Sequence, residues 1–71
     1  MVKKGVYRHY KGHEYRVHSI ARHSETLEDY VVYEPMYKSV SKLWIRPLSM
    51  FIETVDIDGK RVPRFEFIRK E

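Results

Sequence analysis

The stretch TVDIDGKRV, residues 54–62, gives the plainest indication of the fold class of this chain. Asp58-Gly59 is a dipeptide typical of two-residue β-hairpin turns, because both central positions of such a turn adopt positive φ angles. Strand-forming residues flank it on both sides. We therefore expect a strand over residues 54–57 and a returning strand over residues 60–62.

Outside this hairpin, most of the chain consists of short runs rich in Val, Ile, Thr, Tyr, Phe and Trp, the residues enriched in β-strands. These runs predict further strands over Val6–Tyr10, Tyr15–His23, Tyr30–Glu34, Leu43–Arg46 and Phe65–Ile68. No window of about eleven residues carries the apolar period of a helix. The one helical turn that we expect covers Leu48–Phe51 and begins after Pro47.

Three segments interrupt this pattern of simple strands. The expected strand Tyr15–His23 loses its alternation at Ser19-Ile20, where the next large apolar side chain comes one residue out of phase. A β-bulge or a sharp bend there would restore the pattern. The polar segment Ser24–Asp29 predicts a structured loop or a single helical turn, and Lys38–Lys42 predicts an exposed loop tip.

Short strands, one tight hairpin and one helical turn together predict an all-β fold. We expect a small SH3-like or Tudor-like bent barrel of five to six antiparallel strands with one short helical turn, formed by a single domain over residues 1–71. An OB-fold is the nearest competitor. It usually carries a longer helix between its third and fourth strands, and no segment of this sequence predicts one.

Length and composition limit the classes of function. A chain of 71 residues forms one small domain, in which a deep substrate cavity beside a stable core is not expected. It contains no Cys, which excludes disulfides, thiolate catalysis and iron–sulfur clusters and suits a reducing cytoplasm. Fourteen Lys and Arg against ten Asp and Glu give a net charge of +4, which favours anionic partners. Because no apolar run resembles a signal peptide or a membrane span, we expect a cytoplasmic protein with no membrane partner.

Several strings of residues occur together along nearly the whole chain. They are GVYRHYKG (5–12), YRV (15–17), ARHSET (21–26), VVY (31–33), LWIRP (43–47), MF (50–51) and RF (64–65). In these strings the chain resembles DUF1653, a family of short bacterial proteins catalogued as a domain of unknown function. The resemblance implies a compact, mainly β domain and brings no established activity. Any functional inference therefore starts from the residues themselves.

Trp44 and Arg46 are the most informative candidate site residues, because they lie two apart on an expected strand and therefore share a face. Leu43 and Ile45 on the other face are expected to fill the core, which would place the indole and the guanidinium towards a groove or the surface. Such a pair stacks a base, a planar ligand or a peptide proline. The alternative interpretation is structural: Trp44 covers one end of the barrel, and Arg46 pairs with a carboxylate.

Six tyrosines are too many for the core of so small a domain, because buried phenol groups need hydrogen-bond partners. Interleaved with Lys and Arg, they resemble the mixture of stacking faces and cations that binds single-stranded nucleic acid or RNA. Acidic residues between them dilute this signal, and a solvated surface of mixed charge gives the same pattern. We expect Tyr10, Tyr33 and Arg64 to join Trp44 and Arg46 in one aromatic and basic face.

His23-Ser24-Glu25 offers a base, a hydroxyl and a carboxylate side by side, which suggests a hydrolase triad. Neighbouring side chains of an extended chain point to opposite faces, however, and triads draw their members from distant parts of a fold. We expect Ser24 to bond backbone groups, and His23 and Glu25 to share one side of a pocket mouth that binds a polar ligand. The four histidines lack the spacing of a known metal site, so neither a metal nor a cofactor is expected.

These residues favour a non-enzymatic binding module that holds RNA or another anionic ligand on its aromatic and basic face. A peptide or protein partner on the same aromatics is the alternative of the same kind. The alternative of a different class is a small-molecule site, or a minor enzyme, in which His23 acts as acid or base, Glu25 orients it and Arg46 holds an anion.

Overall fold

The computed structural model describes residues 2–37 and 42–71 of the chain. The described residues form seven strands and one short helix. In chain order these are β1 (Gly5–His9), β2 (Glu14–Arg22), β3 (Asp29–Pro35), β4 (Trp44–Pro47), α1 (Leu48–Phe51), β5 (Thr54–Ile57), β6 (Lys60–Pro63) and β7 (Phe65–Arg69). Each element begins and ends within one residue of its expected bounds, so the predicted secondary structure is confirmed.

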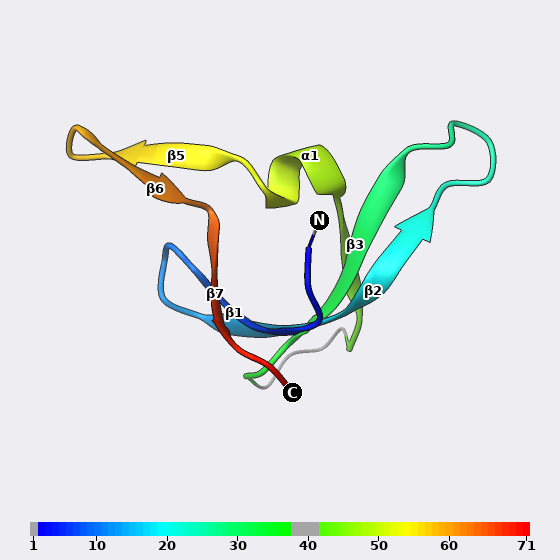
Figure 1. Ribbon diagram of the computed structural model, residues 1–71, viewed down its shortest axis with the longest axis horizontal. Helices are drawn as coiled ribbons and strands as arrows, with labels where there is room; N and C mark the ends of the chain where they lie inside the picture. Colours follow the sequence, from blue (N-terminus) through cyan, green and yellow to red (C-terminus); the bar gives the residue numbers. More distant parts are fainter. Residues whose placement is uncertain (1, 38–41) are drawn as a thin grey trace.

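Five of the strands form one antiparallel sheet in the order β4-β3-β2-β1-β7, and β5 pairs with β6 in a separate hairpin. The sheet is strongly curved, and α1 lies over its concave side (Figure 1). The fold is mostly antiparallel β, as expected. Within the described residues, however, no hydrogen-bonded ladder joins the edge strands β4 and β7. The sheet is therefore open, and the expected SH3-like barrel of five to six strands is not confirmed.

The pairing of β2 with β3 contains the expected bulge. Val17 pairs with Tyr33 and Ser19 pairs with Val32, so the register shifts between Val17 and Ser19. The extra residue restores the alternation, because Val17 and Ile20 both pack towards the core. A bulge also bends its strand, which fits the curvature of the sheet in Figure 1.

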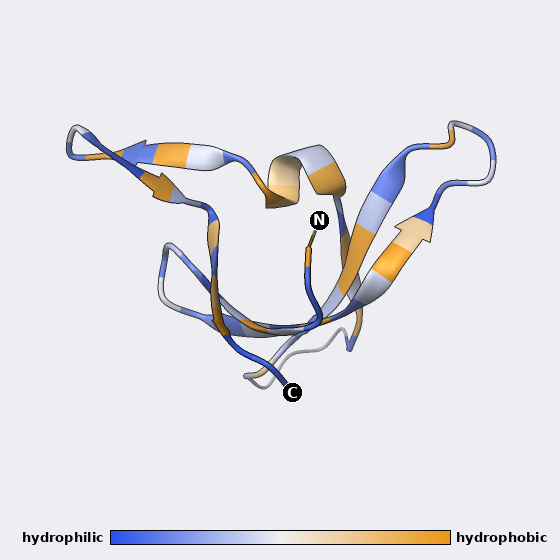
Figure 2. Ribbon diagram, in the orientation of Figure 1, coloured by the Kyte–Doolittle hydropathy of each residue, from blue (hydrophilic) through white to orange (hydrophobic). Residues whose placement is uncertain are grey.

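The core lies on the concave side of the sheet and is built largely from aromatic rings. Phe51 of α1 stacks on Phe65 of β7 with ring centroids 4.1 Å apart, and it packs edge-to-face with Tyr7 and Tyr33. Such ring pairs add to the free energy of apolar burial. The buried members of the core are Tyr7, Tyr15, Val17, Val31, Tyr33, Phe51 and Phe65. Figure 2 shows apolar segments on α1 and on the strands, while the turns are largely hydrophilic.

The turn between β5 and β6 has the geometry that its sequence predicts. Asp58 has a φ of 51° and Gly59 a φ of 80°, and Ile57 pairs with Lys60 across the turn. Positive φ at both central positions is the signature of a type I′ turn, which Asp-Gly favours. In Figure 1 this hairpin extends away from the five-stranded sheet, beyond α1.

The orientation of β4 corrects the sequence-based expectation. Leu43 and Ile45, which were expected in the core, are 60% and 63% exposed. Trp44 and Arg46 instead pair with buried residues of β3. Because cross-strand partners share a face of a sheet, the indole and the guanidinium lie on the concave side. The expectation was wrong because a short edge strand can turn either alternating set inwards, and the neighbouring strand decides which.

Two further segments bear on the predicted loops. The loop between β2 and β3 is confirmed as structured: the backbone N–H of His23 donates to the carbonyl of Glu28, and that of Leu27 donates to the carbonyl of His23, both at 2.8 Å. Of the expected loop tip Lys38–Lys42, residues 38–41 lie outside the described residues, and Lys42 is exposed.

In the part of the chain that the structure describes, no helix has the length and apolar character needed to cross a membrane.

Candidate functional site

Arg46 lies on the concave side of β4, where its neighbours are aromatic. Its Nε donates a hydrogen bond to the Tyr33 hydroxyl at 3.3 Å, and its guanidinium lies 5.4 Å from the centre of the Phe65 ring. The residue is half-buried, yet it forms no ion pair with a carboxylate of the described residues. A half-buried guanidinium without a carboxylate keeps donors available for an anionic ligand.

His9, the last residue of β1, stands at the centre of a group of basic side chains. Its Nδ1 accepts a hydrogen bond from the Lys11 backbone N–H at 3.1 Å, which places the proton of the neutral imidazole on Nε2. Burial lowers the pKa of His9, and nearby positive charges lower this pKa further. Those charges belong to Arg46, Arg64, Lys11 and His13. Basic groups from three separate segments therefore act on one point of the concave side.

Trp44 belongs to a set of aromatic rings beside Arg46. Its ring lies 5.8 Å from that of Tyr15 and 6.5 Å from that of Tyr37. Tyr37 is 38% exposed, and its ring packs at 4.4 Å against His13. The Tyr15 and Tyr37 hydroxyls share a hydrogen bond at 3.3 Å, and burial together with this bond raises the pKa of Tyr15. The rings are thus held relative to one another, with Trp44 and Tyr37 partly open to solvent.

Tyr10 and Arg64 lie on the other flank of His9. The Tyr10 ring packs 4.5 Å from the His9 ring, and the Arg64 guanidinium lies 6.0 Å from the centre of the Tyr10 ring. Arg64 donates hydrogen bonds of 2.6 and 3.2 Å to Glu53, so its charge is partly neutralised. We call this half-open set of side chains the Arg46 surface: His9, Tyr10, Tyr37, Trp44, Arg46 and Arg64.

His23 and Glu25 lie elsewhere, in the loop between β2 and β3. The His23 Nδ1 accepts hydrogen bonds from the backbone N–H groups of Glu25 and Thr26, at 3.1 and 3.2 Å. This loop ends at Asp29, four residues along β3 from Tyr33, which is about 13 Å at the rise of a strand. The structure therefore separates the sequence-predicted site residues into two groups. Arg46, Arg64 and Tyr10 lie around His9, and Tyr33 and Trp44 join this group through the Tyr33–Arg46 hydrogen bond and the Tyr33–Trp44 ring contact. Tyr33 is only 2% exposed, so it supports the group from the core. The second group is His23 and Glu25.

Comparison with known proteins places the chain in a family. A family model described as "Protein of unknown function (DUF1653)" matches residues 5–67, most of the chain. The chain belongs to the DUF1653 family. A crystal structure of a DUF1653 protein from Bordetella bronchiseptica has the same fold, with a TM-score of 0.90 and 38% sequence identity over 99% of this chain and 91% of that chain. A comparison with curated proteins gave no match.

Sequence reasoning missed His9, the centre of the Arg46 surface in this DUF1653 chain. A signal for it exists in the alternation of β1: Tyr7 and His9 are two apart, so both point to the concave side. Sequence reasoning considered His9 only as a possible metal ligand, for which its spacing from the other histidines is unsuitable. Tyr37 carries no comparable signal, because it follows the end of β3, where alternation no longer applies.

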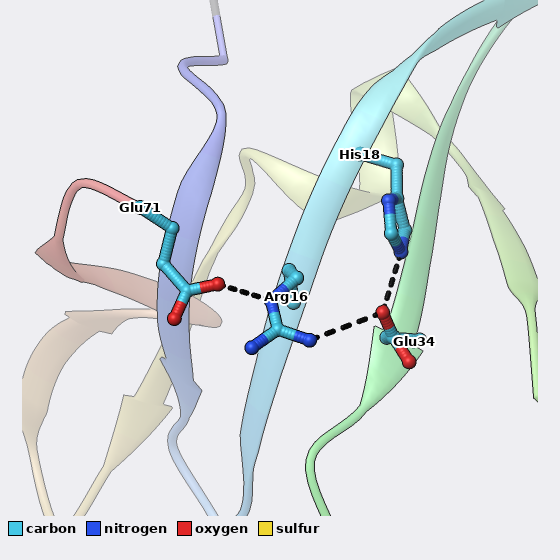
Figure 3. A network of polar contacts seen from close by, with 4 residues as sticks. All are labelled: Arg16, His18, Glu34 and Glu71. Carbon is cyan, nitrogen blue, oxygen red and sulfur yellow. Dashed lines mark hydrogen bonds and ion pairs between the residues drawn. The ribbon is translucent and has the colours of Figure 1, made fainter.

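The convex side of the DUF1653 sheet holds a different arrangement of charge, shown in Figure 3. Arg16 donates to Glu71 and, at 3.3 Å, to Glu34, and His18 donates to Glu34 at 2.6 Å. The bond from His18, followed by that from Arg16, lowers the pKa of Glu34. Arg16 and His18 are already bonded to carboxylates, so they are not candidates for binding an anionic ligand.

Proposed function

We propose that this chain is a non-enzymatic binding module whose Arg46 surface holds single-stranded nucleic acid, with RNA as the first partner to test. The observation that carries the proposal is the guanidinium of Arg46, half-buried among aromatic rings and without a carboxylate among the described residues. A phosphate supplies the missing anion, because the guanidinium fork matches two phosphate oxygens. The Nε2–H of His9 supplies a further donor in the same electropositive region.

The rings beside Arg46 favour an anion that also carries flat groups. Trp44 and Tyr37 expose part of their rings on one flank, and Tyr10 does so on the other. Bases of a single strand stack on such rings, and each stacked base contributes about 1–3 kcal/mol. An anion such as inorganic phosphate would use Arg46 but leave the rings without a role. A single-stranded nucleic acid uses both.

A proline-containing peptide would use the same rings in a different way. It would stack on Trp44 and Tyr37, but it would bring no phosphate to Arg46. Its binding would therefore depend weakly on salt, whereas nucleic-acid binding falls steeply as salt rises, because bound counter-ions are released. The guanidinium without a carboxylate favours the nucleic acid.

Fluorescence anisotropy with a short labelled RNA of mixed sequence tests the proposal. At low salt the wild-type chain should bind, and Arg46→Gln should bind at least about tenfold more weakly, because a hydrogen bond to a charged group contributes roughly 1.5–3 kcal/mol. Arg22→Gln is the matched control, since it removes the same charge from an exposed arginine that pairs with Asp29 beside the β2–β3 loop. Its affinity should stay within about twofold of the wild type.

Two outcomes would overturn the proposal in different ways. Equal losses in Arg46→Gln and Arg22→Gln would show that only net charge matters, and the Arg46 surface would lose its role. Absence of RNA binding at low salt, or tight binding of a proline-rich peptide with little salt dependence, would remove nucleic acid as the partner.

A further inference from the structure

The two arginines of the Arg46 surface differ, because Arg64 is bonded to a carboxylate and Arg46 is not. Nη2 and Nε of Arg64 donate hydrogen bonds to Oε1 of Glu53, at 2.6 and 3.2 Å. The Arg64 side chain is 20% exposed, a lower fraction than that of any other paired cation in the described residues. Water therefore screens the charge of Arg64 less than the charges of those other cations.

The backbone holds Arg64 in place independently of this ion pair. Glu53 lies between α1 and β5, and Arg64 lies between β6 and β7. The backbone N–H of Arg64 donates to the carbonyl of Glu53, and the backbone N–H of Tyr10 donates to the carbonyl of Arg64, both at 3.0 Å. Arg64 should therefore stay beside Tyr10 when the charge of Glu53 is removed.

Glu53 is the exception in a region of positive charge. The basic groups that act on His9 are Arg46, Arg64, Lys11 and His13. Among the described residues, Glu53 is the one carboxylate that forms an ion pair with any member of this set. The pair uses two of the five guanidinium N–H donors of Arg64 and leaves three. A phosphate that reaches Arg64 therefore meets available donors together with a negative charge that repels it.

We propose that Glu53 limits the affinity of the Arg46 surface for RNA, because its carboxylate pairs with Arg64 and repels a phosphate there. This inference rests on the proposed function and adds a residue that sets its affinity. The structural alternative gives Glu53 only the task of holding together the two ends of the β5–β6 hairpin. That alternative predicts no gain in affinity when the charge of Glu53 is removed.

Fluorescence anisotropy with the short labelled RNA of mixed sequence tests the proposal at low salt. Glu53→Gln should bind about tenfold more tightly than the wild type, because Arg64 becomes available to a second phosphate. The slope of log affinity against log salt should steepen by about 0.7, the value for one more neutralised phosphate of a single strand. The fold should persist, since glutamine keeps an oxygen that accepts from Arg64.

The same hairpin offers a matched control for net charge. Asp56 pairs with Arg61 at 3.6 Å, and both side chains are highly exposed. Asp56→Asn removes the same charge as Glu53→Gln, and its affinity should stay within about twofold of the wild type. Arg61→Gln and the double variant of Asp56 and Arg61 should do the same.

A double variant separates the effect of Arg64 from that of the carboxylate alone. Glu53→Gln combined with Arg64→Gln should return to within about twofold of the wild type, because the gain depends on the freed guanidinium. Arg64→Gln alone should bind more weakly than the wild type, since it leaves the Glu53 carboxylate unpaired beside the bound strand.

The Arg64 Nε–H signal in NMR spectra of the wild-type chain gives a second readout that needs no variant. On addition of RNA it should shift less than the Nε–H signal of Arg46, because Glu53 keeps Arg64 away from the phosphates. A larger shift at Arg64 would overturn the proposal.

The outcomes separate this inference from the function on which it rests. Unchanged affinity in Glu53→Gln, an equal gain in Asp56→Asn, or a gain that survives the loss of Arg64 would overturn the role of Glu53 and leave the Arg46 surface standing. Failure of both the wild type and Glu53→Gln to bind RNA at low salt would instead overturn the proposed function, and the role of Glu53 with it.

Discussion

The two sides of the five-stranded sheet differ in whether their arginines are paired with carboxylates. On the convex side Arg16 contacts both Glu34 and Glu71, and His18 shares Glu34 (Figure 3). On the concave side Arg46 has a tyrosine hydroxyl and aromatic rings as neighbours, and no carboxylate of the described residues pairs with it. Exposed ion pairs contribute little to stability, so the convex network mainly organises the surface. In our proposal, the concave side is the place where a ligand supplies the negative charge that Arg46 lacks.

The largest expected effect concerns Phe65, which supports the concave side. Its ring stacks on Phe51 at 4.1 Å, and the Arg46 guanidinium lies over it. Phe65→Ala should lower the free energy of unfolding by about 3–5 kcal/mol, because removal of a buried ring leaves a cavity. Ile45→Ala removes a side chain that is 63% exposed, and it should change stability by less than about 0.5 kcal/mol. Urea denaturation of both variants makes the comparison, and similar losses in the two would contradict the placement of the core.

The lowered pKa of His9 predicts that stability and RNA affinity change in opposite directions with pH. Burial and the neighbouring cations lower the pKa of His9 in the folded chain, so the unfolded chain binds this proton more tightly. The stability that comes from neutral His9 is therefore fully present above the unfolded pKa of about 6.5, and it is lost as the pH falls through the lowered value. A bound phosphate should raise the pKa of His9, so RNA affinity should increase over the same fall in pH.

NMR titration of the His9 ring with and without RNA checks this prediction. The bound chain should show the higher pKa, and His9→Gln should lose the gain in affinity between about pH 7 and pH 5. A His9 pKa that is the same in the free and the bound chain would place the phosphate elsewhere.

The sequence predicted the local structure of this chain better than it predicted contacts between side chains that are far apart in the sequence. The Asp58-Gly59 turn and the bulge after Val17 follow from turn chemistry and alternation, which involve neighbouring residues only. The orientation of β4 does not follow from local sequence, because either alternate pair of its side chains could face the core. Packing against β3 places Trp44 and Arg46 on the concave side. The position of His9 among basic groups depends on contacts between β1, β4 and the segment before β7, which no local pattern records.

The smallest effect is expected on the convex side. Glu34→Gln removes the acceptor that Arg16 and His18 share, while Arg16 keeps Glu71. These side chains are exposed to water, so we expect a slightly lower Tm and an unchanged RNA affinity. The pKa of Glu34 is lowered in the folded chain, so the difference in Tm should be present at neutral pH and disappear as the pH falls through that lowered value. A loss of affinity as large as that of Arg46→Gln would remove the contrast between the two sides.

The most direct measurement follows the guanidinium N–H signals of the wild-type chain by NMR as RNA is added. Our account predicts that the Nε–H of Arg46 shifts in a saturable way, together with the ring of His9, while the Nε–H of Arg16 stays in place. Equal shifts at Arg46 and Arg16, or a moving Arg16 beside an unmoved Arg46, would contradict it.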